Sequence, residues 1–357
     1  MKRIPIEHVR LERNTLGHGA SARVVKGVLT CCYTAEDKND TGGSSSSNSQ
    51  ENVAKSGQAV VVKIVDVNDR NEELKAEYNA YTKLHEGRGE QGSHHVRAVH
   101  GIIDDEEKNK FVMEKMDTSL YDILDTGGDL QVQKWFPTAS TSISLLLDIV
   151  QGLIELHSVG IVHCDLRPSN VLLLRHRSTL SSSSSVNDGI HFTAKVADLG
   201  TSDPIDTPFQ SAYVNRRKKL VHLTSDRHAT SALDVHGLGV MMMEIMCGRA
   251  FQTQGDLNTA RRSLRADLVH YATQHAQLKQ EDIDTEAIEV DYPSCMYVFK
   301  KRSRGTSWTR PAFANDILAM KELLELAEKC VDVDPSKRPS AETVRDGLLF
   351  AALLTWY

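Results

Sequence analysis

The sequence HCDLRPSN occupies residues 163–170 and is followed at once by the apolar run VLLL at 171–174. Its acid, Asp165, and its amide, Asn170, stand five residues apart on a tight loop that leads into an expected strand. An acid and an amide at that separation can place a base and a metal ligand around one reacting phosphate group. The alternative is a polar turn that contains a buried His163 and carries no chemistry. The sequence on either side of the loop decides between these interpretations.

A cation stands in an apolar run before this loop. The run AVVVKIV at 59–65 has the β-branched composition of a strand and contains Lys63. An unpaired buried ammonium group is costly, so Lys63 needs an acidic partner. Apolar residues over 72–84 recur at helical spacing, and Glu77 lies on the neighbouring stripe of that helix. Glu77 is the expected partner, and the alternatives near the start of the helix are Glu72 and Glu73.

Two glycines near the N-terminus could contact a phosphate. The sequence LGHGASARVV at 16–25 falls within two expected strands between residues 9 and 33. Gly17 and Gly19 would let the backbone approach closely, so that N–H groups meet the phosphate oxygens. Ala22 stands where a third glycine would complete a glycine-rich phosphate loop. An ordinary hairpin turn is the alternative, because two glycines alone are a weak signal.

A further acid follows the central loop. Residues 192–197 read as a short strand that ends in Asp198, Leu199 and Gly200. An acid at the end of a strand and before a glycine turn is well placed to bind Mg²⁺ that faces phosphate oxygens.

The remaining pattern mixes strands, helices and polar loops. Strands are expected at 99–103 and 110–113, and the extended polar connector at 114–120 could bind a planar base through its backbone. Helices are expected at 142–157, 234–246, 320–331 and 341–354. Two serine-rich stretches, 37–58 and 178–188, have almost no large apolar side chain and are expected to be disordered insertions.

Composition excludes several classes of protein. A chain of 357 residues is long enough for two lobes, and a formal charge of −6 gives no basic footprint for nucleic acid or a charged membrane. The six cysteines form no CxxC pair, which favours a reducing compartment. The N-terminus lacks the apolar core of a signal peptide, and no apolar run is long enough for a membrane span. A cytoplasmic or nuclear location is expected, whereas the oligomeric state is not indicated.

Taken together, these motifs resemble the eukaryotic-type protein kinase domain over residues 9–354. They occur in the family's order: glycine loop, Lys63, Glu77, Asp165, Asn170, Asp198, the helix that begins near Asp234, and Arg338. The resemblance implies a bilobal α+β fold. Its small β-rich N-lobe, 9–116, would contain one main helix, and its larger C-lobe, 117–354, would be mostly helical.

The resemblance also implies a function and a site. The chain would transfer the γ-phosphate of ATP, with Mg²⁺, to Ser or Thr hydroxyls of a protein substrate. The catalytic residues would be Asp165, Lys63, Glu77 and Arg167. The magnesium ligands would be Asn170 and Asp198. The ATP-binding residues would be Leu16, Gly17, Gly19, Val24, Val61, Lys63, Met113, Glu114, Met116 and Leu172. Met113 would be the gatekeeper, Glu114 the first hinge residue, and Asp234 the anchor under the catalytic loop.

Several positions depart from the family pattern. Cys164 replaces the usual Arg before the catalytic Asp, Leu199 replaces a Phe, and Val61 replaces a small Ala. No Ala-Pro-Glu precedes the helix at 234–246, which would leave Arg338 without its usual carboxylate. A pseudokinase that binds nucleotide or partners without turnover is therefore the main alternative. A small-molecule kinase is disfavoured by the Asp234 and Arg338 motifs, and a P-loop NTPase is excluded because the chain has no GxxxxGK[ST].

Overall fold

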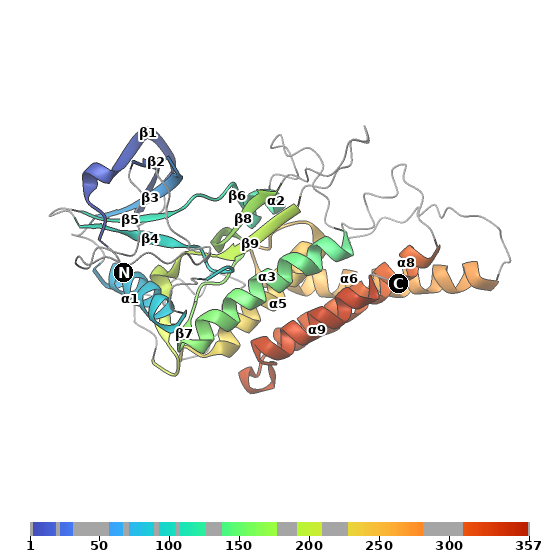
Figure 1. The fold of residues 1–357 in the computed structure, drawn as a ribbon. Helices are drawn as coiled ribbons and strands as arrows, with labels where there is room; N and C mark the ends of the chain where they lie inside the picture. The colour runs from blue at the N-terminus through green and yellow to red at the C-terminus, as the bar shows by residue number, and fades with distance from the viewer. Residues whose placement is uncertain are drawn as a thin grey trace, which may run out of the picture. The chain divides into compact units, whose positions relative to one another are not determined.

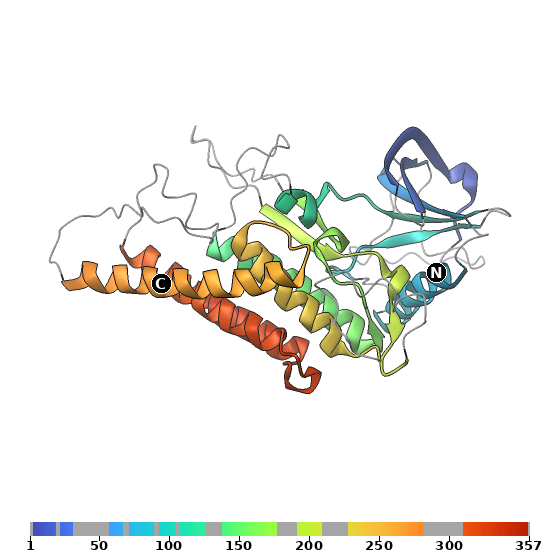
Figure 2. The same ribbon diagram turned by 180° about the vertical axis from the view of Figure 1, so that it is seen from behind.

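The computed structural model describes residues 3–18, 22–30, 57–66, 71–88, 93–104, 108–125, 138–176, 191–208, 228–280 and 310–355. These form two compact units (Figures 1 and 2). The first comprises Met1–Met116 together with Asp198–Ser202, and the second comprises Asp117–Ala197 and Asp203–Tyr357. The first unit is rich in β-sheet and the second is mainly helical, so the expected α+β fold class is confirmed.

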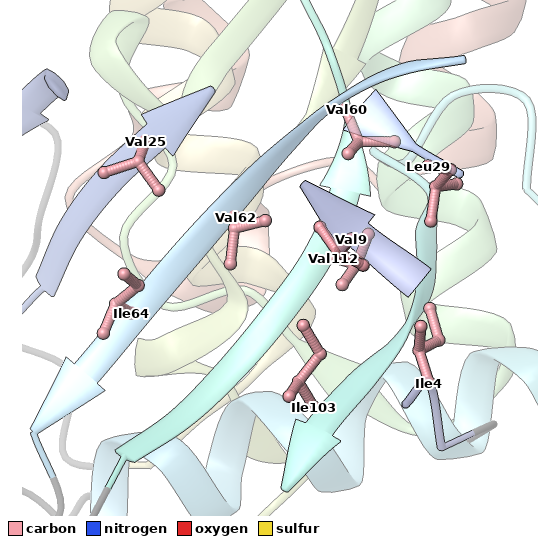
Figure 3. Packing of buried hydrophobic residues seen from close by; sticks show 9 residues of the cluster. All are labelled: Ile4, Val9, Val25, Leu29, Val60, Val62, Ile64, Ile103 and Val112. Atoms are coloured by element: carbon pink, nitrogen blue, oxygen red, sulfur yellow. The ribbon is translucent and has the colours of Figure 1, made fainter. Parts of the chain in front are cut away.

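A five-stranded antiparallel sheet forms the body of the first unit. Its strands are β1 (Val9–His18), β2 (Ala22–Leu29), β3 (Ala59–Asp66), β4 (Val99–Asp104) and β5 (Lys108–Glu114), in the spatial order β1-β2-β3-β5-β4. A short 3₁₀ turn, η1 (Ile6–His8), precedes β1. One face of the sheet packs into an apolar cluster (Figure 3). The cluster contains Ile4, Val9, Val25, Leu29, Val60, Val62, Ile64, Ile103 and Val112.

The opposite face of this sheet carries Lys63. Side chains alternate along a strand, and directly paired residues of antiparallel strands share a face. Val60 and Val62 lie in the apolar cluster, so Val61 and Lys63 point to the other side. The sheet register pairs Val61 with Met113, and Lys63 with Val24. Four of the residues expected to bind nucleotide therefore share one face of one sheet.

The first unit also contains one long helix and one short 3₁₀ turn. The helix α1 (Asn71–Arg88) contains the expected helical segment at 72–84 and carries Glu77. The turn η4 (Leu199–Thr201) packs against α1 within this unit.

The second unit is built around the helix α3 (Ala139–Ser158). Thr138 begins the helix by accepting a hydrogen bond from the Thr141 N–H at 3.1 Å. By length and composition α3 is the one helix among the described residues that could cross a membrane. However, 61% of its apolar window is buried, and it packs against α9 (Ala341–Leu354) and β9 (His191–Val196). Both ribbon views show α3 alongside α9 (Figures 1 and 2). Its apolar character is therefore explained by the core of this unit.

Other elements complete the second unit. The helices are α2 (Leu120–Asp125), α5 (Ser231–Cys247), α6 (Gln254–Gln280) and α8 (Arg310–Cys330), with 3₁₀ turns η3 (Pro168–Asn170) and η5 (Pro335–Lys337). A small sheet has the order β6-β8-β9, with β6 (Thr118–Ser119) and β8 (Val171–His176). A second pair joins β7 (Ile161–Val162) to β10 (Asp203–Pro204). Every residue of α5 from Leu233 to Met246 is buried, as its apolar sequence indicates.

Most of the two serine-rich stretches lies outside the described residues. Of 37–58, only Gly57 and Gln58 are described, and main-chain hydrogen bonds join both to Leu29. These two residues therefore continue the β2–β3 hairpin rather than belonging to the expected loop. The stretch 178–188 lies entirely outside the described residues.

Candidate active site

Lys63 is the centre of a charged cluster in the first unit. Its Nζ atom lies 2.9 and 3.1 Å from the two carboxylate oxygens of Glu77, and 2.8 Å from Asp198 Oδ1. Glu77 is only 2% exposed. Burial alone would lower the pKa of Lys63, but the charges and hydrogen bonds of the two carboxylates raise it above its ordinary value. The expected ion pair between Lys63 and Glu77 is present, and Asp198 is a second partner that the sequence did not suggest.

Asp198 has an unusual backbone conformation. Its φ of 65° and ψ of 71° lie in the left-handed region, which costs a non-glycine residue about 1 kcal/mol and which Asp tolerates better than most. Its side chain is 47% exposed, and its Oδ1 contacts Lys63. The next residue, Leu199, is buried. The local backbone thus presents an accessible acid beside the Lys63 ammonium group.

The loop at 163–170 holds Asp165 within the second unit. Asn170 Nδ2 donates to the main-chain oxygen of Asp165 at 2.8 Å and to its Oδ2 at 3.0 Å. Arg167 Nε lies 3.2 Å from the same Oδ2, although the angle is not that of a hydrogen bond. Pro168 opens the 3₁₀ turn that brings Asn170 back towards the acid. The side chain of Asp165 is therefore fixed by an amide and lies beside a cation.

Asp234, in the first turn of α5, binds the main chain of this loop. Its Oδ2 accepts from the His163 N–H at 2.8 Å, and its Oδ1 accepts from the Cys164 N–H at 3.0 Å. His157 Nε2 lies 2.9 Å from Oδ2. Asp234 is 1% exposed, so these contacts satisfy a buried carboxylate. Asp234 holds the loop as the resemblance implies.

His163 joins the loop to the end of β9. Its Nδ1 accepts a hydrogen bond from the Asp165 N–H at 3.2 Å, and its Nε2 lies 2.9 Å from the Ala197 carbonyl oxygen. Because a carbonyl only accepts, Nε2 carries the proton and the ring is neutral. The Ala197 N–H donates to Asn170 O at 2.9 Å. Asp198 is the next residue in the chain, so a residue fixed by the loop immediately precedes it.

The structure places most of the expected nucleotide-binding residues. Val24, Val61 and Met113 share the Lys63 face of the sheet, and Gly17 pairs with Val24 in β1 and β2. Glu114 ends β5 and Met116 follows it. Leu172 lies in β8 of the second unit. Of the rest, Gly19 and the side chain of Leu16 lie outside the described residues.

Arg97 is a charged residue of this site that sequence reasoning missed. It precedes β4, and its Nε donates to the Glu114 carbonyl oxygen at 3.0 Å. Burial lowers the pKa of Arg97, and the charges of Tyr81, Glu77, Glu114 and Asp198 oppose that change. Its guanidinium group therefore lies against the main chain of Glu114, the expected first hinge residue. The available signal was a cation within the apolar sequence VRAV at 96–99.

Comparison with known proteins identifies the family. The sequence profile of the protein kinase domain matches residues 36–350. The chain belongs to the protein kinase domain family. The match begins after the expected glycine loop.

Similar kinases share low identity with this chain. A G-type lectin S-receptor-like serine/threonine-protein kinase of Oryza sativa subsp. indica is 28% identical over 120 residues, 32% of this chain and 13% of that protein. A probable leucine-rich repeat receptor-like protein kinase of Arabidopsis thaliana is 25% identical over 244 residues, 65% of this chain and 23% of that protein. A probable receptor-like protein kinase of Arabidopsis thaliana is 25% identical over 268 residues, 70% of this chain and 66% of that protein. The chain thus spans less than a quarter of the first two relatives.

The three substituted positions of the kinase pattern, Val61, Cys164 and Leu199, are all buried. Cys164 is fully buried against Val162, Ala229 and Leu233. The guanidinium group of Arg338 donates to the main-chain oxygens of Asp332 and Ala232, at 2.8 and 3.0 Å. The segment 219–223, where the family has Ala-Pro-Glu, lies outside the described residues. Within the described part of the chain, main-chain carbonyls therefore serve as partners of Arg338.

Asn170 of the second unit and Asp198 of the first unit each carry an oxygen atom of the kind that Mg²⁺ prefers. Mg²⁺ prefers oxygen ligands and is commonly held by one or two carboxylates together with substrate phosphates. Asn170 directs its amide nitrogen at Asp165, and among the described residues the contact of its Oδ1 is with Ser169 Oγ, at 3.5 Å. Asp198 presents a half-exposed carboxylate. Among the described residues there is no group of three or more His, Cys, Asp or Glu that would hold a metal without a substrate.

Proposed function

We propose that this chain is an active protein kinase that transfers the γ-phosphate of ATP, with Mg²⁺, to Ser or Thr hydroxyls of a protein. The observation that carries the proposal is the Lys63 ammonium group, bonded to both Glu77 and Asp198. These acids come from segments 14 and 135 residues away, so their convergence on one cation is a property of the fold. The matching family and its serine/threonine kinase relatives support the same conclusion.

Each residue has a role that its contacts support. Lys63 would bind the α- and β-phosphates, and Glu77 would hold it in place. Asp165, oriented by Asn170 and lying beside Arg167, would accept or orient the proton of the acceptor hydroxyl. Asn170 and Asp198 would hold Mg²⁺, which supplies positive charge against the charge that develops on the transferred phosphoryl group.

A transfer assay with matched variants tests the proposal. Purified protein, Mg²⁺ and labelled ATP are incubated with Ser, Thr and Tyr peptides, and Asp165→Asn is assayed in parallel. We expect label on Ser or Thr peptides from the wild type, and a loss of at least about 100-fold in Asp165→Asn, since removal of a positioned base costs that much. Equal incorporation by both proteins contradicts the proposal. Nucleotide binding without any incorporation would identify a pseudokinase.

A further inference from the structure

Arg338 bonds to the first turn of the helix that holds the loop at 163–170. Its Nη1 donates to the Ala232 carbonyl oxygen at 3.0 Å, and its Nε donates to the Asp332 carbonyl oxygen at 2.8 Å. Ala232 lies in α5, two residues before Asp234. Arg338 is 8% exposed, and all of these residues belong to the second unit. The guanidinium group therefore joins the connection between α8 and α9 to the start of α5.

The connection that carries Arg338 has its own hydrogen bonds. The turn η5 begins at Asp334, whose Oδ1 accepts from the Ser336 N–H at 3.0 Å. The Arg338 N–H donates to Pro335 O at 3.2 Å, and Pro339 follows directly, which favours the extended backbone that Arg338 adopts. The turn also contacts α5. The backbone around Arg338 is therefore fixed, which directs the guanidinium group at its carbonyl partners.

The start of α5 is not fixed by a cap of its own. A Ser, Thr, Asn or Asp side chain before a helix normally accepts a hydrogen bond from one of the first N–H groups and so fixes the first turn. Thr230 occupies that position before α5, but its side chain makes no capping hydrogen bond. Its buried Oγ1 has no partner among the described residues. The hydrogen bond from Arg338 to Ala232 supplies, from outside the helix, a restraint that the cap does not provide.

The first turn of α5 matters because it carries Asp234. The carboxylate of Asp234 accepts from the main-chain N–H groups of His163 and Cys164, at 2.8 and 3.0 Å, and Asp165 is the next residue. A shift of this turn would lengthen those bonds, and a displacement of a catalytic group by about 1 Å can reduce turnover by about 100-fold. A continuous path thus runs from Arg338, through the first turn of α5, to the residue that the proposed function assigns as the base.

We propose that Arg338 is a positioning residue for phosphoryl transfer: it holds the first turn of α5, and through Asp234 it holds the loop that carries Asp165. The inference rests on the proposed function. The donors of Arg338 carry this role rather than its charge, because a cation near the N-terminus of a helix is electrostatically unfavourable. Lys63 and Glu77, which would bind the nucleotide phosphates, belong to the first unit. Arg338 should therefore affect turnover rather than nucleotide binding.

Two measurements on the full chain test the assignment in Arg338→Met, Arg338→Lys and Lys337→Met. The first is steady-state transfer to a Ser or Thr peptide, analysed as kcat and as KM for ATP. The second is amide hydrogen exchange at residues 163 and 164, whose N–H groups donate to Asp234, with 143–156 of α3 as the internal reference. Exchange requires no catalysis, so it reports on the loop independently of activity. Lys337→Met is the matched control, because it removes the neighbouring cation, whose side chain is 68% exposed.

We expect Arg338→Met to lower kcat by about tenfold or more, with KM for ATP within about twofold of the wild type. Amide exchange at 163 and 164 should become about tenfold faster, because the loss of one such hydrogen bond shifts a local opening equilibrium by about that factor. Exchange in 143–156 should not change. Arg338→Lys keeps the charge but lacks the fork of donors, so its kcat should be intermediate. Lys337→Met should match the wild type.

Contrary results separate this assignment from the proposed function. Unchanged exchange at 163 and 164 in a folded Arg338→Met overturns the assignment, whatever its kcat. Faster exchange with an unchanged kcat also overturns it, because transfer would then not depend on this contact.

A general effect on the second unit overturns the assignment as well. Exchange that becomes equally faster in 143–156, or failure of both Arg338 variants to fold, would show that Arg338 stabilises the whole unit rather than the loop. A wild type that transfers no phosphate overturns the proposed function, whereas faster exchange confined to 163 and 164 would still show that Arg338 holds the loop.

Discussion

Among the described residues, two aspartates adopt the left-handed backbone conformation, and they differ in their surroundings. Asp198 and Asp206 have φ values of 65° and 63°. Both are exposed, but only Asp198 contacts Lys63. Asn tolerates this conformation as well as Asp does, so Asp→Asn changes the charge of each side chain with little backbone cost.

Asp198→Asn should abolish phosphoryl transfer while the protein remains folded. The amide cannot supply the negative charge that holds a metal ion against the phosphate, and such a loss costs several kcal/mol of barrier. Asp206→Asn is the control and should retain activity. Incorporation of labelled phosphate measures the activity of both variants, and circular dichroism spectra show whether each remains folded. An Asp198→Asn enzyme within about tenfold of the wild type, or about 1.4 kcal/mol, would remove Asp198 from the magnesium site.

Cys164 belongs to an apolar cluster of the second unit, and this determines which side chains can replace it. Its neighbours are Val162, Ala229 and Leu233, and its side chain is fully buried. Restoring the family's residue by Cys164→Arg would bury a charge among apolar side chains, with an expected cost of at least about 3 kcal/mol. Cys164→Ala should cost about 1 kcal/mol. Urea unfolding compares the stabilities of the two variants. Equal unfolding midpoints would show that the arginine side chain is paired or solvated at this position.

Lys63 and Arg97 show why the sequence revealed one cation of the site and not the other. Both stand in apolar runs, which is the common signal of a buried charge that needs a partner. Lys63 pairs with a side chain on a neighbouring helix, and helical spacing made Glu77 a candidate. Arg97 bonds to the main-chain carbonyl of Glu114, 17 residues away. A carbonyl is present at every position, so no sequence pattern marks it as a partner.

At the scale of elements, the close approach of α5 and α8 depends on one glycine. A Cβ atom added at Gly239 would lie 2.5 Å from Cys330 Cβ and 2.9 Å from the main-chain oxygen of Ala327. Neither of these atoms belongs to the flexible end of a side chain, so the helices would have to move apart. Cys330 is buried, and burial raises the pKa of its thiol to about 12. The contact therefore lies inside the core of the second unit.

Gly239→Ala should destabilise the protein, although alanine favours helices. Overpacking of a core costs about 1 to 3 kcal/mol, which exceeds the gain in helix propensity of about 1 kcal/mol. Gly255 of α6 is the matched control, because its nearest neighbour, Thr253 Oγ1, lies 3.4 Å from an added Cβ. Gly255→Ala should be neutral or stabilising. Thermal unfolding of both variants is the measurement, and a Gly239→Ala protein as stable as the wild type would show that the helices separate at no cost.

The ends of two hairpins explain how the chain can carry its serine-rich insertions. Val28 pairs with Ala59 where β2 and β3 meet, and His176 pairs with His191 at the ends of β8 and β9. Each insertion therefore connects strand ends that already lie side by side. The polar composition of these insertions could be seen in the sequence. The pairing register of the flanking strands, which brings the ends of each insertion together, could not be predicted from it.

Deleting residues 40–54 or 179–187 should leave stability nearly unchanged. Halving a flexible loop alters its closure entropy by only about 0.6 kcal/mol, and the strand pairs at its ends remain. Both deletions should unfold cooperatively within a few degrees of the wild type in differential scanning calorimetry. Unfolding that begins more than about 10 °C lower would show that the deleted residues pack against a folded unit.

At the scale of the whole molecule, the chain passes between its two units at three points. It crosses after Met116, before Asp198 and after Ser202, so that Asp198–Ser202 belongs to the first unit while its flanks belong to the second. Ala197 is fixed by His163 and Asn170, and Asp203 pairs with Val162. The segment that carries Asp198 is thus held at both ends by contacts that involve no phosphate.

This anchoring leads to a prediction about regulation. In most protein kinases an arginine before the catalytic Asp attracts a phosphate on the following segment, and Cys164 cannot do so. Of the candidate acceptors, Thr201 and Ser202 are buried, and Thr207 Oγ1 donates to Pro204 O at 2.7 Å. The fourth, Ser211, lies outside the described residues, as do four cations that could replace the missing arginine: Arg216, Arg217, Lys218 and Lys219.

Basal activity should therefore not require phosphorylation of this segment. Protein treated with a phosphatase should transfer phosphate to peptide within about twofold of untreated protein, because the chain on both sides of residues 198–202 is already held without a phosphate. Alanine at Thr207 and Ser211, alone and together, should give the same result. Loss of activity on dephosphorylation, restored by phosphorylation of Ser211, would show that a cation from 216–219 has taken the role of the arginine. If phosphatase treatment also inactivates the double alanine variant, and rephosphorylation does not restore its activity, the treatment has damaged the fold. Thermal unfolding of the treated protein detects such damage.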